Sequence, residues 1–270
     1  YRRQRQMCIR DRYRTSIRNM ALNGAESIGA MGVDTPLAVF SKQNRPLFDY
    51  FKQLFAQVTN PPIDCIREEI VTSTSVYVGR DGNLLEEEPK NCQVLKINNP
   101  ILTNTDMLKI KNMKVEGFKA VTVPITYYKS APLDRAMDRL FVEVDRAHRA
   151  GANILILSDR GVDENHVAIP SLLAVSAVHQ HLVKTKKRTS LAIILESGEP
   201  REVHHFATLL GYGACAINPY LALDTIHELI EEGMIKKDYY AAVEDYNHAV
   251  ISGIVKIAAT DSYTHLRAHE

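Results

Sequence analysis

The sequence is poor in cysteine and contains no paired cysteine motif. None of the four cysteines stands in a CxxC spacing, so the sequence predicts neither a zinc site nor a disulfide framework. Free cysteine is among the most buried residue types. We therefore expect buried free thiols at Cys8, Cys65, Cys92 and Cys215.

The chain also lacks an excess of charge and a long apolar run. Its 33 basic and 32 acidic residues give a net charge of +1, too little to indicate a nucleic-acid or membrane partner. No apolar run approaches the roughly 20 residues that span a bilayer, and no secretory signal is recognisable. With 45% hydrophobic residues the chain can bury a sizeable core. We expect a globular protein of the cytoplasm, or of a plastid if the source is a photosynthetic eukaryote.

Metal and nucleotide motifs are missing as well. The adjacent His204 and His205 would point about 100° apart on a helix, so they cannot share one ion as an i, i+4 pair can. We expect one of them to face strands or a neighbouring domain and the other to face solvent or a carbonyl. Gly211 and Gly213 precede a predicted strand, whereas a dinucleotide fingerprint follows one, so they indicate a helix stop and a turn.

The two ends of the chain show no globular patterning. Residues 1–12 hold five arginines against one aspartate, and residues 261–270 follow an apolar helix abruptly. Both resemble translated adapter sequence, so we exclude them from the fold. The predicted domain is 13–260, with an irregular part at 13–117 and repeating units at 118–260.

From residue 118 onward, apolar runs alternate with amphipathic segments. The predicted strands start about 24 to 38 residues apart, the spacing of parallel strands joined by helices. The strands are predicted at 118–128, 152–159, 190–197 and 214–218, and the helices at 130–151, 170–187, 199–211 and 220–233. This pattern predicts an α/β fold with a partial, barrel-like parallel sheet of about four βα units. Because exposed apolar edges promote aggregation, we expect the N-terminal segment or neighbouring domains to cover them.

The first part of the chain is less regular. We predict helices at about 46–57, 63–70 and 100–113, with Asp64 capping the second and an Asn or Thr capping the third. A strand with a turn at Asp81–Gly82 should lie between them. This irregular segment is expected to wrap the sheet.

Polar residues follow three of the predicted strands, where α/β proteins usually place their chemistry. Asp159 and Arg160 follow the second strand in the loop 158–161, and Glu196 begins the loop 196–199 at the end of the third. Asn218, Pro219 and Tyr220 lie at the end of the fourth strand. These side chains would suit a phosphate or amino-acid substrate. They would equally suit an ionic network that holds loops or an adjacent domain, and we favour the network because no lysine base, Cys–His pair or phosphate-binding glycine run accompanies them.

Several longer motifs are specific enough to indicate a family. DTPLAVFS, FAQVTNPPID, ILILSDRG and LESGEPREVHHFATLLGYGACAINPYLA resemble the central domain of the glutamate synthase large subunit. The resemblance covers nearly all of residues 13–260 in order. Cys65 is a departure, because the family commonly has proline there.

The resemblance implies a non-catalytic domain within a larger enzyme. In the family it links a glutaminase domain to an FMN-containing synthase domain and helps enclose an ammonia route. The whole enzyme makes glutamate from glutamine and 2-oxoglutarate by reductive amination, as an oxidoreductase acting on CH–NH2 donors. The fragment alone is then expected to be inactive and to bind no cofactor, since FMN and an iron–sulfur cluster belong to the full-length enzyme. Its partners would be the amidotransferase and FMN domains of the same chain, with a small reductase subunit or ferredoxin serving the whole enzyme.

A rigid Pro–Pro bend followed by small hydroxyl residues suggests a lining for the ammonia route. The interdomain or ammonia-route candidates are Thr59, Asn60, Asp64, Arg67, Glu68, Thr72 and Thr74. Two other hypotheses stay open: a free-standing β/α enzyme acting on a small anionic metabolite, and a binding or assembly module.

Overall fold

The computed structural model describes residues 2–26, 37–42, 44–52, 72–83 and 85–260, with side chains from residue 13 to residue 258 within those ranges. The chain divides into two compact units. We call Ser75–Glu199 with Leu209–Leu221 the sheet unit, and Tyr1–Thr74 with Pro200–Thr208 and Ala222–Glu270 the helical unit.

The sheet unit is built on four parallel strands in the order β3-β5-β7-β8. They are β3 (Ala120–Pro124), β5 (Ile154–Ser158), β7 (Ala192–Glu196) and β8 (Ala216–Asn218). Each strand is followed by a helix: α4 (Leu133–Arg149), α5 (Ser171–Lys184), α6 (Val203–Gly211) and α7 (Tyr220–Glu231). The predicted succession of four βα units, with neighbouring strands in chain order, is confirmed.

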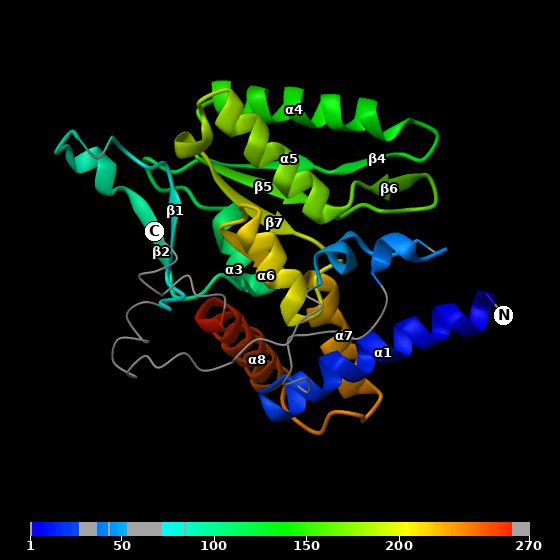
Figure 1. The fold of residues 1–270 in the computed structure, drawn as a ribbon. Coiled ribbons are helices and arrows are strands. Elements are labelled where there is room, and N and C mark those ends of the chain that lie inside the picture. The colour runs from blue at the N-terminus through cyan, green and yellow to red at the C-terminus, as the bar shows by residue number, and fades with distance from the viewer. Residues whose placement is uncertain (1, 27–36, 43, 53–71, 84, 261–270) are drawn as a thin grey trace. The chain divides into compact units, whose positions relative to one another are not determined.

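Both faces of this sheet are covered, which explains the continuous apolar runs of its central strands. Every residue of β5 and β7 is buried. On one face, Ile156 and Ile194 pack in a single core with Met107 and Ile110 of α3 (Asn104–Lys111). On the other side of the strands, α4 contacts β3, α5 contacts β7, and the two helices contact each other (Figure 1). The buried stripe of α4 is Ala136, Leu140, Val144 and Ala147.

Residues 75–117 supply the cover on the α3 face. Strands β1 (Val76–Gly79) and β2 (Val94–Ile97) pair antiparallel, with the short helix η3 (Pro89–Cys92) between them. The free edge of β8 is paired as well, because Ile217 N–H donates to the Pro100 carbonyl and Leu102 N–H donates to the Ile217 carbonyl, both at 2.8 Å. The expected edge cover is confirmed there. The prediction that the whole irregular segment 13–117 wraps the sheet is not confirmed, because the described residues before 75 belong to the helical unit.

The predicted strand 118–128 is wrong as one element. It splits into β3 and β4 (Thr126–Tyr128), and β4 pairs antiparallel with β6 (His166–Ala168) in a separate two-stranded sheet. Proline has no N–H to donate to a ladder, so Pro124 is a natural end for β3. The next residue, Ile125, donates its N–H to the Ser158 carbonyl at 2.9 Å and turns into β4.

Two N-terminal predictions also need correction. The helix expected at 46–57 is only a short 3-10 helix, η2 (Leu47–Phe51), because Lys52 is already extended. No hairpin turn lies at Asp81–Gly82, since Gly79 of β1 pairs with Val94 of β2 across the long connection. The predicted helix at 63–70 lies outside the described residues.

The helical unit contains α1 (Arg2–Asn23), η1 (Ala38–Phe40), η2, α8 (Tyr239–Thr260) and most of α6 and α7. α1 packs along α8 (Figure 1). Its C-terminal carbonyls are capped, because Lys237 Nζ donates to the Leu22 carbonyl at 2.5 Å and His248 Nδ1 lies 2.9 Å from the Gly24 carbonyl oxygen. The backbone of α1 begins within the stretch set aside as adapter-derived, whose origin stays a prediction. None of the helices in the described part of the chain is long and apolar enough to cross a membrane.

Candidate functional site

Polar side chains gather where β5, β7 and β8 end. The strand register places Ser158 beside Glu196 and Glu196 beside Asn218. We call this group the strand-end cluster; its members are Lys111, Ser158, Asp159, Arg160, Glu196, Ser197, Asn218 and Tyr220. The structure thus brings together the three strand-end residues singled out from the sequence.

Glu196 is the centre of the cluster. It is only 2% exposed, and its carboxylate accepts hydrogen bonds from Ser158 Oγ at 2.6 Å and from Lys111 Nζ at 2.8 Å to each oxygen. Arg160 Nε donates to its Oε1 at 2.8 Å. Burial alone would raise the pKa of Glu196, but the hydrogen bonds from these three donors hold it below its ordinary value.

The carboxylate of Asp159 also accepts several hydrogen bonds. Its Oδ2 accepts from Ser197 Oγ at 2.6 Å and from the Gly198 N–H at 3.0 Å. The hydroxyl of Tyr220 also hydrogen-bonds to this carboxylate, and burial together with that contact raises the pKa of Tyr220. A carboxylate with this many donors has little capacity left to accept a proton or a metal ion.

The cluster therefore holds separate segments together. Glu196 joins α3 to the ends of β5 and β7, and Asp159 fixes the turn after β7. Glu199 completes the arrangement by accepting from the Ser171 N–H at 2.8 Å and its Oγ at 2.5 Å, at the start of α5. This geometry is the ionic network that the sequence analysis favoured.

Lys111 is the member that sequence reasoning missed. A signal for it exists, because it follows the buried Met107 by four residues and so belongs to the inward face of α3. The sequence shows that this helix has an inward face, but it does not show which strand end the lysine meets.

Asn218 ties β8 to the beginning of α3. It is fully buried, and its Nδ2 donates to the Leu102 carbonyl at 3.0 Å and to Asn104 Oδ1 at 3.1 Å. Among the described residues, its Oδ1 has no partner.

The two adjacent histidines both contact Phe48 of η2. His204 Nε2 lies 2.8 Å from the Phe48 carbonyl oxygen, so its expected carbonyl contact is confirmed. His205 is buried and stacks on the Phe48 ring at 4.5 Å, rather than facing strands or a neighbouring domain. Its Nδ1 accepts from the Arg201 N–H at 3.2 Å, and burial lowers the pKa of His205 to about 3. No group of three or more His, Cys, Asp or Glu side chains poised for a metal occurs in the described part of the chain.

The cysteine and glycine predictions had different outcomes. Cys92 is exposed at the end of η3 and Cys215 is half-buried, so the expectation of buried thiols is wrong for Cys92 and only partly met at Cys215. The side chains of Cys8 and Cys65 are not among those that the structure describes. Gly211 ends α6, and Gly213 has φ +112° in the turn to β8, as predicted.

The ammonia-route candidates mostly fall outside the described residues. Thr72 and Thr74 are described and lie just before β1, within the irregular approach to that strand. The remaining candidates, for which the structure gives no placement, are Thr59, Asn60, Asp64, Arg67 and Glu68. Their role stays a prediction.

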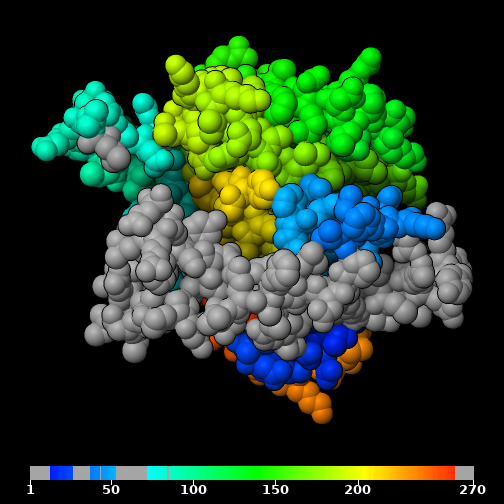
Figure 2. Space-filling view, in the orientation of Figure 1, coloured from blue at the N-terminus to red at the C-terminus, as the bar shows by residue number. Residues whose placement is uncertain are grey.

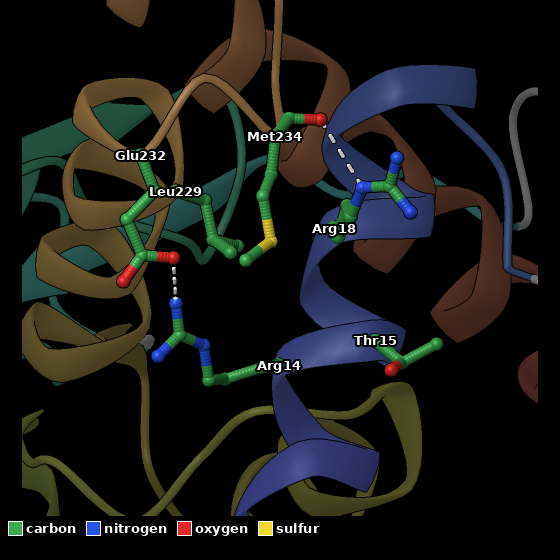
Figure 3. A pocket seen from close by; sticks show the side chains of 6 residues that line it. All are labelled: Arg14, Thr15, Arg18, Leu229, Glu232 and Met234. Atoms are coloured by element: carbon green, nitrogen blue, oxygen red, sulfur yellow. Dashed lines mark hydrogen bonds and ion pairs between the residues drawn. The ribbon is translucent and has the colours of Figure 1, made fainter.

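The helical unit contains a cavity of about 470 Å³ (Figure 3). Both arginines of its lining already have partners, because Arg14 is ion-paired with Glu232 and Arg18 Nε donates to the backbone carbonyl of Met234 at 3.1 Å. These contacts tie α1 to the end of α7 and the chain after it. The lining residues are Arg14, Thr15, Arg18, Leu229, Glu232 and Met234.

Several curated proteins are similar to this chain. The glutamate synthase (NADPH) large chain of Bacillus subtilis is 46% identical over 234 residues, which cover 87% of this chain and 15% of that protein. The glutamate synthase (NADH) of Schizosaccharomyces pombe is 41% identical over 93% of this chain and 12% of its own length. The ferredoxin-dependent glutamate synthase 2 of Synechocystis sp. is 39% identical over 88% of this chain and 16% of its own length. The chain thus spans only 12% to 16% of these relatives.

The family model for the glutamate synthase central domain matches residues 2–266. Among solved structures, a flavocytochrome b2 is similar over 58% of this chain and 34% of that chain, at 14% identity and a TM-score of 0.38, which is too low to support an argument. With nearly the whole chain matched by the family model, this protein belongs to the glutamate synthase central domain family.

Proposed function

We propose that this chain is the non-catalytic central domain of a glutamate synthase. In that role it links the glutaminase domain to the FMN synthase domain and helps enclose the ammonia route between them. The whole enzyme makes glutamate from glutamine and 2-oxoglutarate by reductive amination, with a small reductase subunit or ferredoxin delivering electrons. The relatives include NADPH-, NADH- and ferredoxin-dependent forms. Two of them are chloroplastic, which supports a plastid location if the source is a photosynthetic eukaryote; for other sources we propose the cytoplasm.

The observation that carries this proposal is the full engagement of the two buried carboxylates. A general base needs a free acceptor position and a pKa near the working pH. Glu196 has a lowered pKa and accepts from three side chains, and Asp159 accepts from three groups of its own. These contacts support a role in positioning rather than in bond making.

The described residues do not fit either cofactor of the full-length enzyme. Met107 and Ile110 of α3 pack in a buried core against one face of the sheet, so that face is closed to a flavin ring. The Gly198 N–H, which would suit a phosphate, already donates to Asp159. Cys92 and Cys215 are the only thiols in the described side chains, and they do not make a cluster site. We therefore assign FMN and the iron–sulfur cluster to other domains.

An apolar surface supports contact with a neighbouring domain. Exposed large hydrophobic residues gather on η1, η2 and the residue before η1, in the light-blue segment that lies on the surface in Figure 2. We call them the apolar patch: Leu37, Val39, Phe40, Tyr50 and Phe51. Contiguous exposed apolar residues of this kind commonly mark interaction surfaces.

Reconstitution tests the proposal. Separately produced glutaminase and FMN synthase domains are mixed with this chain, and glutamate formation is measured together with ammonia released into solution. We expect the chain to raise glutamate formation and lower ammonia release, while the chain alone shows neither flavin absorbance nor glutaminase activity. Stoichiometric flavin on the chain, or turnover of glutamine by the chain alone, would contradict the proposal.

The other two hypotheses lead to different results. A free-standing enzyme for a small anionic metabolite would need Asp159, Arg160 and Glu196 as active groups, and the geometry gives it less support because both carboxylates are engaged. An assembly module would associate with the glutaminase domain without changing where the ammonia goes.

A further inference from the structure

We propose that Arg160, supported by Lys111, binds the carboxylate group of a small molecule at the strand-end cluster. This site is independent of the proposed linking function, because it requires only the sheet unit.

The guanidinium of Arg160 is held on one edge and free on the other. Its Nε donates to Glu196 Oε1 at 2.8 Å, and its Cζ lies 4.0 Å from the centre of the Tyr220 ring. Within the described residues no partner is recorded for either Nη group, and the side chain is 45% exposed. An arginine fixed in this way presents two parallel N–H donors, which match the two oxygens of a carboxylate.

The local charge also favours an anion. Lys111 and Arg160 share one carboxylate, that of Glu196, so these three groups carry one surplus positive charge, and Asp159 brings the strand-end cluster as a whole to zero. Asp159 is the nearby acid, and its carboxylate is directed to other donors: Ser197 Oγ, the Gly198 N–H and the Tyr220 hydroxyl.

The position is open to a ligand. Gly161 follows Arg160 with φ +99°, and a Cβ placed there would meet no atom within 4 Å. The carboxyl ends of parallel strands are the usual place for ligands in α/β folds. The partly exposed side chain of Arg160 and the open surroundings of Gly161 leave this position accessible to solvent.

A carboxylate fits better than a phosphate. Phosphate sites usually add several free backbone N–H groups to the cationic side chains. Here the Gly198 N–H donates to Asp159, and the Arg160 N–H donates to Ser158 Oγ at 3.3 Å. One free guanidinium edge, with its two parallel donors, therefore favours a planar monoanion.

The experiment is an NMR titration of the 15N-labelled chain with sodium acetate, against sodium chloride at equal ionic strength. The Arg160 Nε–H and the Gly161 amide are the reporters. We expect a saturable shift of both signals with acetate and not with chloride. Linear shifts that match the chloride series would overturn the proposal, and so would inorganic phosphate binding as tightly as acetate.

Two variants and a matched control locate the site. Arg160→Gln should abolish saturation at the Gly161 amide, and Arg160→Lys should weaken acetate binding by roughly tenfold, since a lysine keeps the charge but not the paired donors. Arg135→Gln, at an exposed position of α4, should bind acetate as the unchanged chain does. If either Arg160 variant still binds acetate saturably with unchanged affinity, the assignment is contradicted. Arg160→Lys provides the test if Arg160→Gln does not fold.

The source of the carboxylate is tested in the full-length protein. If a small molecule is the natural ligand, acetate saturates the site there as well. If an acidic side chain of another domain fills it, acetate does not bind the full-length protein, and the assignment to a small molecule fails.

Discussion

Glu196 is the residue whose replacement should most disturb the strand-end cluster. Glu196→Gln keeps the shape but removes the charge that compensates Lys111 and Arg160. We expect the free energy of unfolding to fall by about 2 kcal/mol, below the roughly 3 to 5 kcal/mol for fully buried ion pairs, because both cations are partly exposed. Urea unfolding of the purified chain measures it.

The matched control is Glu143→Gln, which removes an ion pair between neighbouring turns of α4. That change should stay within about 0.5 kcal/mol. Equal losses of unfolding free energy in the two variants would mean that the contacts of Glu196 stabilise the fold no more than a surface ion pair does.

His205 should make stability depend on pH. Its pKa is about 3 in the folded chain, whereas an exposed histidine has a pKa of about 6.5, so between these values only the unfolded chain takes up the proton. Stability is therefore lost as the pH falls below about 6.5, by up to about 1.4 kcal/mol per pH unit for one proton. The lowered pKa of Glu196 adds its own loss only at lower pH, as the pH falls through a value below the ordinary 4.5. In His205→Asn, the slope of unfolding free energy against pH between 7 and 5 should decrease.

The exposed His227→Asn variant controls for the loss of one histidine. Identical slopes in the two variants would show that burial of His205 is not the source of the pH dependence. His204, whose pKa burial also lowers, should account for part of any slope that remains in His205→Asn.

At the scale of elements, α3 is both the helix that fills one sheet face and the carrier of Lys111. Its start is fixed by a capping box, in which the Thr103 hydroxyl accepts from the Asp106 N–H at 3.1 Å and the Asp106 carboxylate accepts from the Thr103 N–H at 3.3 Å. Thr103→Ala should lower the free energy of unfolding by about 1 kcal/mol. Thermal unfolding compares it with Thr105→Ala, an exposed change in the first turn that should be close to neutral. A larger loss from Thr105→Ala would contradict this account of the helix start.

The elements also show where pattern reading succeeds and fails. The helix after Thr103 was predictable because its cap is local, with donor and acceptor three residues apart. The end of β3 was not recognised although Pro124 is visible in the sequence, since β-branched residues continue beyond it. Only the antiparallel partner β6 shows that residues 126–128 leave the parallel sheet.

For the whole molecule, the apolar patch is the feature that an isolated chain should reveal. Phe40 is 76% exposed, so Phe40→Ser should change the free energy of unfolding by no more than about 0.5 kcal/mol. It should nevertheless reduce concentration-dependent association in sedimentation velocity, because exposed apolar patches promote association. Leu85→Ser, at a position that is 93% exposed in the sheet unit, is the control and should leave association unchanged. If Phe40→Ser associates as strongly as the unchanged chain, the apolar patch is not the surface that mediates association.

The sequence by itself determined the family, the four βα units and the place where the polar loops meet, because each depends on local patterns and on chain order. It also brought Asp159, Arg160 and Glu196 to one end of the sheet, since carboxyl ends of parallel strands share an edge. Only the tertiary structure decided what those residues do there. Lys111 and Glu196 are separated by 85 positions, and no periodicity specifies that one neutralises the other. The same contact leaves one edge of Arg160 free, so the chemistry open to this cluster depends on long-range side-chain pairing that only the folded chain determines.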